Sequence, residues 1–364
     1  MMPGEVRVLI AGVGIAGLAL ARALARSRVS VELIEREPAW RRAGTGVYLP
    51  GNTARALRTL GLERQVAARA VEIERQRFCD HRGRLLFDVD VRELWAGVGP
   101  CLALHRADLH QALLDGTADV PIRLGCGIDS LAERNGAVAV ELSDGSGGEY
   151  DLVVGADGIR SAVRRLMFGT APRTLGQTGW RFLAPRPPEL EGWSVMLGRR
   201  AAFLTLPIAD DWVYCYGDVL AREPAESLVL SLSRFDGLAQ QLVAGAADVH
   251  VSTIEEVALD RWVRGRVVLI GDAAHATSPN MAQGVAMALE DALVLADCVR
   301  SQRSIPDVLA AFVARRRPRT DWVRAQTHRR DRTRYLAAPL RDSVLRLAGQ
   351  RIFRANYRPL LADP

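Results

Sequence analysis

The stretch VRVLIAGVGIAG, residues 6–17, joins a short β-rich run to three glycines spaced Gly-x-Gly-x-x-Gly. A helical pattern follows it directly, and Val29–Ile34 is a second β-rich run. Strand, tight turn, helix and strand in this order form a βαβ unit. In such a unit Gly12 permits the tight turn, Gly14 lets the backbone approach a pyrophosphate, and Gly17 lets the helix pack closely on the strand. The stretch therefore predicts the first unit of a Rossmann-like sheet.

A carboxylate at the end of the second β-rich run indicates a nucleotide ligand for this unit. Glu35 lies 18 residues after Gly17, where it can accept both ribose hydroxyls of an adenosine. The predicted helix opens near Ile15 and Ala16, so its free N–H groups and its positive dipole end face the phosphates. A glycine-rich turn without a ligand does not require the acidic residue, and we predict a dinucleotide site.

The composition is that of a globular chain with more than one core. Its 364 residues are 49% hydrophobic and 25% charged, which favours one large and one smaller domain. No run of eighteen apolar residues occurs, so we expect no membrane span. A cleaved signal peptide is the weaker interpretation of the N-terminal apolar run, because the glycine spacing already explains that run. The five scattered cysteines suit a reducing cytoplasm and argue against a disulfide framework or a zinc site.

The basic residues narrow the class of ligand. The net charge is +6, and all 48 basic residues are arginines, which make planar contacts to phosphate and carboxylate. No nucleic-acid-binding motif accompanies them, so a charged cofactor and a solvated surface explain them better than nucleic acid. The absence of lysine excludes a mechanism that needs a Schiff-base amine.

The pattern along the chain predicts a discontinuous first domain. Strand patterns, tryptophans and tyrosines gather between residues 171 and 257, and the α/β pattern returns afterwards. We expect an α/β dinucleotide-binding domain over residues 1–170 and 258–364. A mostly antiparallel sheet domain over 171–257, with strands from about 71–100, would bind the substrate. The C-terminus is expected to be helical and broken at Pro318.

Three smaller expectations concern single residues. Asn52 is expected to cap a helix that ends near Leu60. The run Arg315–Arg317 is expected to be a solvated helix face. His275 is expected to be a hydrogen-bonded structural histidine rather than a catalytic base, and we expect no metal site at any histidine.

Three spaced motifs together resemble one family. They are the glycine motif with Glu35 and Arg36, the Asp157-Gly158 stretch, and the segment from Gly271 to Ala292. In this order they resemble the single-component FAD-dependent aromatic hydroxylases of the para-hydroxybenzoate hydroxylase type, with the nearest similarity to the shorter salicylate- and urate-hydroxylase-like members. The resemblance covers nearly the whole chain. It implies a Rossmann-like FAD-binding domain with an inserted, mostly antiparallel substrate sheet and a helical C-terminus.

The resemblance also implies which residues hold FAD. Asp272 would bind the ribityl chain, Arg106 would lie against the cofactor, and Arg42 would help to place the flavin ring. The chain departs from many members at Ala282, where they have glycine, and at Ala286, where they have asparagine. The implied FAD-binding set is Gly12, Gly14, Ile15, Ala16, Gly17, Glu35, Arg36, Arg42, Gly46, Val47, Arg106, Asp157, Asp272, Pro279, Ala282, Gly284 and Val285.

The substrate side of the site is predicted from one strand. Trp212, Tyr214 and Tyr216 alternate, so one face of this strand carries three aromatic rings. If that face points at the flavin, the rings line the substrate pocket; if it points away, they are sheet-packing residues. Tyr214 is our candidate proton acceptor, and a relay of backbone and water is the alternative. Further substrate candidates on neighbouring strands are Trp180, Arg181, Arg200 and Phe203.

The resemblance implies the reaction. NADPH or NADH binds transiently and reduces FAD, dioxygen forms a flavin hydroperoxide, and one oxygen atom passes to an electron-rich aromatic or heteroaromatic small molecule. We expect a cytoplasmic monomer or homodimer that binds this substrate and dioxygen, and neither nucleic acid nor a metal. Two alternatives stay open: an FAD-dependent reductase or dehydrogenase on the same scaffold, and a non-catalytic FAD- or ligand-binding accessory protein.

Overall fold

The computed structural model describes residues 6–25, 27–39, 45–190, 192–209, 211–220, 232–235, 237–333 and 335–364. Its strands are β1 (Val6–Ala11), β2 (Val29–Glu35), β3 (Gly46–Leu49), β4 (Val71–Glu72), β5 (Arg75–Asp80), β6 (Leu85–Asp90), β7 (Leu102–His105), β8 (Ile122–Leu124), β9 (Ile128–Arg134), β10 (Ala137–Leu142), β11 (Gly147–Tyr150), β12 (Leu152–Gly155), β13 (Arg173–Pro185), β14 (Trp193–Leu197), β15 (Ala201–Pro207), β16 (Trp212–Leu220), β17 (Ala247–Glu256), β18 (Val263–Arg264) and β19 (Val267–Leu269). Its helices are α1 (Ile15–Leu24), α2 (Gly51–Thr59), α3 (Glu63–Ala67), α4 (Val91–Leu94), α5 (Arg106–Asp115), α6 (Ala162–Phe168), α8 (Leu238–Ala244), α9 (Asp272–His275), α10 (Gly284–Ser301), α11 (Ile305–Thr333) and α12 (Ala338–Tyr357), with 3₁₀ turns η1 (Pro279–Met281) and η2 (Arg358–Leu360).

The first sheet is Rossmann-like, as the glycine motif predicts. Its strand order is β18-β19-β12-β1-β2-β8, and β1 pairs in parallel with both β2 and β12. Its central strands are buried, because α1 packs against β1 and β2, and β11 and β10 of the three-stranded sheet β11-β10-β9 pack against β1 and β12. From β1 the chain continues through α1 to β2, which lies on one side of β1. Strand β12, on the other side of β1, comes much later in the sequence. The carboxyl ends of β1 and β12 therefore form a switch point, where ligands of such sheets bind.

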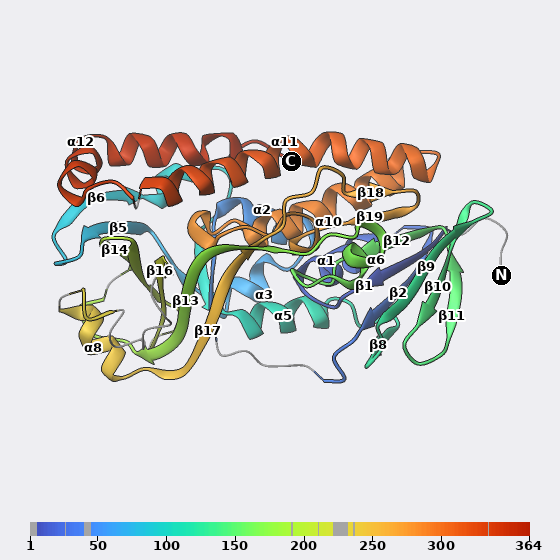
Figure 1. Ribbon diagram of the computed structural model, residues 1–364, viewed down its shortest axis with the longest axis horizontal. Helices are drawn as coiled ribbons and strands as arrows, with labels where there is room; N and C mark the ends of the chain where they lie inside the picture. The colour runs from blue at the N-terminus through green and yellow to red at the C-terminus, as the bar shows by residue number, and fades with distance from the viewer. Residues whose placement is uncertain are drawn as a thin grey trace.

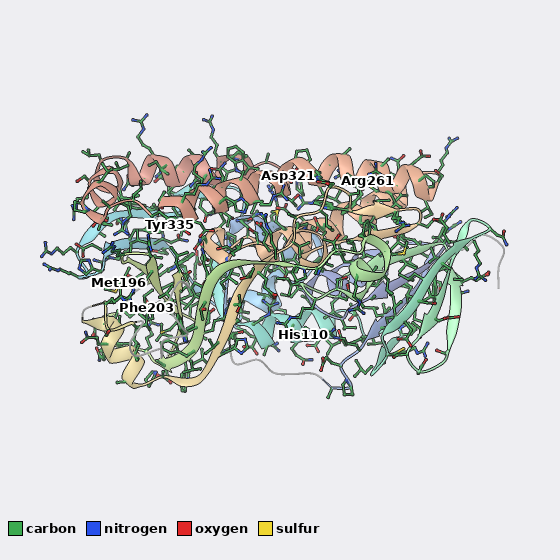
Figure 2. All side chains as sticks on the ribbon, viewed as in Figure 1. His110, Met196, Phe203, Arg261, Asp321 and Tyr335 are labelled. Atoms are coloured by element: carbon green, nitrogen blue, oxygen red, sulfur yellow. The ribbon has the colours of Figure 1, made fainter. Side chains whose placement is uncertain are left out.

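The second sheet has seven strands in the order β17-β13-β16-β15-β14-β5-β6. It is antiparallel except where β14 runs parallel to β5, so two strands from early in the chain complete it. One face packs on α8, with Met196 and Phe203 in the same buried cluster (Figure 2). The other face is turned toward the Rossmann-like sheet and the C-terminal helices. The two sheets thus enclose a space between them.

Helices α11 and α12 run side by side along one long edge of the molecule (Figure 1). The expected break at Pro318 is wrong, since α11 continues through it from Ile305 to Thr333. A proline inside a helix removes a backbone hydrogen bond and costs about 3 kcal/mol. Arg316 and Arg319, on either side of Pro318, both donate to the buried carboxylate of Glu290. These contacts hold both halves of the helix on α10 and offset the lost bond.

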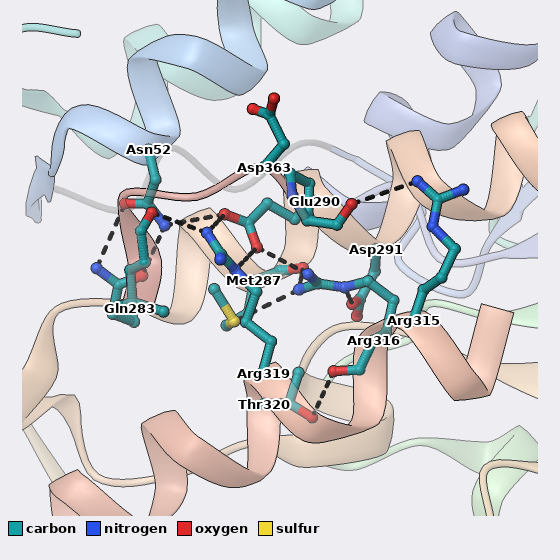
Figure 3. A network of polar contacts seen from close by, with 12 residues as sticks. Asn52, Gln283, Met287, Glu290, Asp291, Arg315, Arg316, Arg319, Thr320 and Asp363 are labelled. Carbon is teal, nitrogen blue, oxygen red and sulfur yellow. Dashed lines mark hydrogen bonds and ion pairs between the residues drawn. The ribbon is translucent and has the colours of Figure 1, made fainter. Parts of the chain in front are cut away.

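A buried ionic network connects α11 to the Rossmann-like sheet (Figure 3). We call it the Arg316 network; its members are Asn52, Gly271, His275, Gln283, Glu290, Asp291, Arg316 and Arg319. The Arg316 side chain is 0% exposed and donates to Asp291 and Glu290, at 2.8 Å each. The expectation that Arg315–Arg317 is a solvated helix face is therefore wrong for Arg316, the middle residue. The buried carboxylates of Glu290 and Asp291 on α10 bind this arginine in the interior.

Asn52 does not have the position that the sequence predicts. Asn52 does not cap α2: Pro50 takes that position, and the Asn52 amide donates to Gln283 and Glu290 inside the Arg316 network. All five cysteines are buried and unpaired. Among the described residues, no helix is long and apolar enough to cross a membrane.

Replacing Arg316 with methionine tests how much the network stabilises the fold. The change leaves the buried carboxylates of Glu290 and Asp291 short of a cation, which typically costs about 3–5 kcal/mol. Arg315→Met is the matched control, because Arg315 pairs with Asp297 at the surface and such pairs contribute about 1 kcal/mol or less. Chemical denaturation of the two variants should separate them clearly. Equal losses would show that the network does not stabilise the fold as described.

The network also predicts a pH dependence. Burial alone would raise the pKa of Asp291, but His275 and Arg316 lower it to about 2. An unfolded aspartate has a pKa of about 3.9. Stabilisation by this carboxylate is therefore fully present above that value and is lost as the pH falls toward about 2. The difference in unfolding free energy between the protein and Asp291→Asn should shrink as the pH falls below about 4, where Asp291 is protonated in the unfolded chain but still ionised in the folded one. A difference that instead grows with acid would contradict the assignment.

Candidate active site

A cavity of about 670 Å³ lies between the two sheets and the C-terminal helices. One end reaches the switch point, where Gly14, Ile15 and Ala16 line it. From there it passes the segment from Asp272 to Val285 and continues along the seven-stranded sheet to α12. The position of the cavity joins the predicted cofactor residues to the predicted substrate strand.

The glycine turn forms a cradle at the first end. A Cβ atom on Gly17 would lie 2.0 Å from the Gly12 carbonyl oxygen, and Gly12 itself has φ +105°, so both positions require glycine. A Cβ on Gly14, in contrast, would point into open space. Helix α1 begins at Ile15 without a side-chain cap, which leaves its first N–H groups free. This geometry suits a pyrophosphate.

Glu35 stands beside the cradle at the end of β2. Its carboxylate accepts the backbone N–H groups of Val13 and Glu37, at 3.1 Å each. These bonds hold the carboxylate in place and leave acceptor capacity for ribose hydroxyls. The neighbouring Arg36 is 58% exposed and lies near Glu37, outside the cavity wall.

Asp157 carries an unused acceptor close to the same end. Its Oδ2 accepts the N–H groups of Ala162 and Val163 at the start of α6, at 2.7 and 3.2 Å. Its Oδ1 is buried and has no hydrogen-bond partner among the described residues. Burial raises the pKa of Asp157. A buried acceptor without a donor is explained if a bound cofactor supplies one.

The segment after β19 is shaped by the Arg316 network. Asp291 accepts the Gly271 N–H at 2.9 Å and contacts His275 Nε2 at 2.6 Å, so it fixes both ends of the short helix that carries Asp272. Asp272 is exposed and faces the cavity. The carboxylate at the end of the strand is thus presented to a ligand by a second, buried carboxylate.

The loop before α10 follows, and Pro279, Ala282, Gly284 and Val285 all line the cavity. Ala282 has φ +48°, in the left-handed region where glycine is favoured. The family's usual glycine at this position therefore has a conformational reason, and this chain accepts an alanine there at a cost of roughly 1 kcal/mol. Helix α10 begins without a side-chain cap, so its free N–H groups also face the cavity. Such a terminus stabilises negative charge on a bound ring.

Strand β3 brings the cofactor segment against the substrate sheet. Gly46 and Val47 line the cavity, and a Cβ on Gly46 would lie 2.4 Å from the Cβ of Tyr214. Only glycine permits this approach of β3 to β16. Arg106, at the start of α5, also lines the cavity, and its backbone N–H donates to the Thr45 carbonyl. Arg42 lies outside the described residues.

The substrate candidates divide between the two faces of the seven-stranded sheet. Arg181, Tyr214 and Tyr216 line the cavity. Trp180 neighbours Arg181 in β13 and therefore points to the opposite face, and Phe203 packs there against Phe182 and Phe235. Two more candidates lie outside the wall: Trp212 is 40% exposed at the start of β16, and Arg200 stacks on Tyr335.

Two polar groups beside the two tyrosines, Asp218 and Ser252, were not singled out from the sequence. The Tyr216 hydroxyl donates to the buried Asp218 at 2.9 Å, and Arg181 donates to Ser252 at 2.6 Å and stacks on Tyr216. Asp218 lies two residues after Tyr216 on β16, which was the available signal for this pair. Burial raises the pKa of Tyr214 despite the opposing effect of Arg181 and Arg106, so this phenol stays protonated at neutral pH.

The described residues hold no cluster of three or more side chains suited to a metal ion. The cradle, the carboxylates of Glu35 and Asp272, the unpartnered Asp157 oxygen and the open start of α10 instead fit FAD. The chain matches the model of the FAD binding domain family over residues 5–183 and 238–326.

Comparison with known proteins extends this match to whole chains. A 2-heptyl-3-hydroxy-4(1H)-quinolone synthase of Pseudomonas aeruginosa is 37% identical over 338 residues, covering 88% of this chain and 87% of that protein. A 3-amino-4-hydroxybenzoate 2-monooxygenase of Streptomyces cremeus is 32% identical, covering 91% and 87%. Klebsiella pneumoniae HpxO, solved with FAD and uric acid, superposes with a TM-score of 0.84 at 26% identity, covering 98% and 95%. The chain belongs to the FAD-dependent aromatic monooxygenases, the family to which its three sequence motifs pointed.

Proposed function

We propose that the substrate is an uncharged nitrogen heterocycle of the 4-quinolone class, hydroxylated at the ring carbon next to the carbonyl. The class of reaction follows from the family: FAD, when bound, takes electrons from NADH or NADPH and activates dioxygen for transfer of one oxygen atom to an aromatic ring. The relatives do not support the alternatives of a reductase or an accessory protein. The aromatic ring of the substrate remains to be proposed, because one relative is named for a quinolone and the other for a benzoate.

The cavity wall favours the neutral ring over an aromatic carboxylate. The wall beside Tyr214 and Tyr216 is largely aromatic and aliphatic. Apart from Arg106, which the family resemblance assigns to the cofactor, the arginines of the wall already have protein partners: Arg181 binds Ser252, Arg330 donates to Tyr357 at 3.0 Å, and Arg160 is near Glu255. A carboxylate would have to draw one of them away, whereas a quinolone needs only a donor for its carbonyl and an acceptor for its N–H. This wall is the observation that carries the proposal.

We assign complementary roles to the two tyrosines. Tyr214, which the sequence suggested as a proton acceptor, has a raised pKa and is better suited to donate a hydrogen bond to the carbonyl. Tyr216 can accept the proton that the ring loses on hydroxylation, because its own proton can pass to Asp218 at 2.9 Å. Asp218 is fully buried, so this proton moves within the protein and not through solvent.

The remaining proposals concern the cellular location and the oligomeric state of the enzyme. The five unpaired, buried cysteines support a reducing cytoplasm. We also propose a monomer or a homodimer, because the described residues of one copy line a cavity that extends from the glycine cradle to helix α12.

Product analysis tests the choice of ring. The FAD-loaded protein with NADH or NADPH and ¹⁸O₂ should convert 2-heptyl-4(1H)-quinolone into a product carrying one ¹⁸O on the ring. With 3-amino-4-hydroxybenzoate, the same protein should consume NAD(P)H no faster than without substrate. Labelled product from the benzoate and none from the quinolone would reverse the assignment.

Two matched tyrosine variants test the roles. Tyr216→Phe should lower hydroxylation on the order of a hundred-fold, the typical effect of losing a general base, while the rate of FAD reduction stays the same. Tyr214→Phe removes one hydrogen bond of about 1 kcal/mol and should weaken substrate binding about five-fold. Stopped-flow reduction and product yield per NAD(P)H measure the two effects separately. If Tyr216→Phe keeps the full product yield, Tyr216 does not accept the proton.

A further inference from the structure

The cavity continues past the tyrosines in a direction that the flavin and a bicyclic ring do not use. Strand register places five cavity-lining side chains in one row across the sheet: Arg181, Tyr216, Leu204, Val195 and Phe78. Neighbouring strands lie about 4.8 Å apart, so the row is roughly 19 Å long. Its first two members are polar and its last three are apolar. The wall therefore changes from polar to apolar along its length.

The polar end is the end that faces the flavin. Strand β3 packs on Tyr214, and β17, which pairs with β13 at Arg181, leads directly into Val257, whose N–H donates to Ala276 in the segment after β19. Phe78 lies four strands away from Arg181, near the edge of the sheet. Phe78 is buried against Phe87 and Phe353 and closes the far end of the row. A ring held between Tyr214 and Tyr216 thus leaves the half-buried Leu204 and Val195 uncovered between the ring and Phe78.

Helix α12 covers this apolar end. Leu345, Gly349, Ile352 and Phe353 all line the cavity, and their spacing places them on one face of the helix. A Cβ on Gly349 would lie 2.4 Å from the ring of Phe87, so this glycine lets β6 and α12 come together over the channel. Ile352 is 41% exposed, which places it at the rim where the channel reaches the surface.

The two faces of the seven-stranded sheet differ in how completely their apolar side chains are buried. On the α8 side Met196 and Phe203 are buried by protein, whereas Val195 and Leu204, their direct neighbours on the cavity side, are only half-buried. Apolar side chains in the middle of a sheet are normally covered. A ligand that is itself apolar and linear in shape would cover them.

We propose that this channel, from Leu204 to Ile352, binds an alkyl chain carried by the substrate ring. The inference rests on the proposed quinolone function and adds to it that the ring bears a hydrophobic tail, with the tail lying between β14, β5 and α12. Each methylene that enters the channel leaves water. Tail length, more than ring substitution, therefore determines affinity.

Binding of a homologous series tests the proposal. The holoenzyme is titrated with 2-methyl-, 2-propyl-, 2-pentyl- and 2-heptyl-4(1H)-quinolone, and the change in the flavin absorption spectrum reports Kd. Burial of a methylene strengthens binding about four-fold, so Kd should fall on the order of a hundred-fold from propyl to heptyl. Equal Kd values across the series would overturn the channel while leaving the quinolone function intact. If none of the four compounds binds, the proposed function itself fails.

A pair of leucines on α12 locates the tail. Leu345→Trp fills the channel and should weaken heptyl binding at least ten-fold while changing methyl binding by less than two-fold. Leu347→Trp is the control, because Leu347 is 86% exposed and lies outside the cavity wall. Ala202→Leu narrows the channel from the sheet side and should repeat the effect of Leu345→Trp. Retained methyl binding shows that each variant is folded. If Leu345→Trp and Leu347→Trp have the same effect on heptyl binding, the tail does not lie there.

Discussion

The carboxylate of Asp291 is the contact on which the site depends. It is fully buried, and it accepts the Gly271 N–H, contacts His275 and pairs with Arg316. Through Gly271 it sets the turn that presents Asp272 to the cavity, and through Arg316 it draws α11 onto α10. A charge in this position is tolerated only because every oxygen has a partner. The same group therefore fixes the cofactor loop and the C-terminal helices that roof the cavity.

That double role explains how the two halves of the cavity keep their relative position. The Rossmann-like sheet supplies the glycine cradle and the open start of α10, and the seven-stranded sheet supplies the tyrosines and the apolar row. Contact between Gly46 and Tyr214 joins the two on one side. Helix α11, anchored by Arg316 and Arg319, joins them on the other side together with α12, to which Trp322 of α11 donates at Asn356. A flavin and a ring substrate can meet reproducibly only if both connections are rigid.

Sequence alone predicted the parts of the molecule whose cause is local. The glycine motif and the carboxylate of Glu35 predicted the Rossmann-like fold, and together with the Asp157-Gly158 stretch and the segment from Gly271 to Ala292 they pointed to the FAD-dependent family. Predictions from the sequence were wrong where contacts with residues far away in the chain determine the structure. Pro318 stays helical and Arg316 is buried because of Glu290 and Asp291 on another helix, and Asn52 leaves its capping role for the same network. The contribution of α12 to the cavity was not foreseen either, because nothing in its own sequence shows which face meets β5 and β6.

We propose that this cavity brings a neutral, tail-bearing heterocycle to a flavin. The most direct test of this proposal is the rate at which NADH or NADPH bleaches the bound flavin under anaerobic conditions, measured with and without each ligand. We expect 2-heptyl-4(1H)-quinolone to accelerate the reduction and 3-amino-4-hydroxybenzoate not to accelerate it, since only the former fits the aromatic wall and the apolar row. Acceleration by the benzoate alone would contradict it.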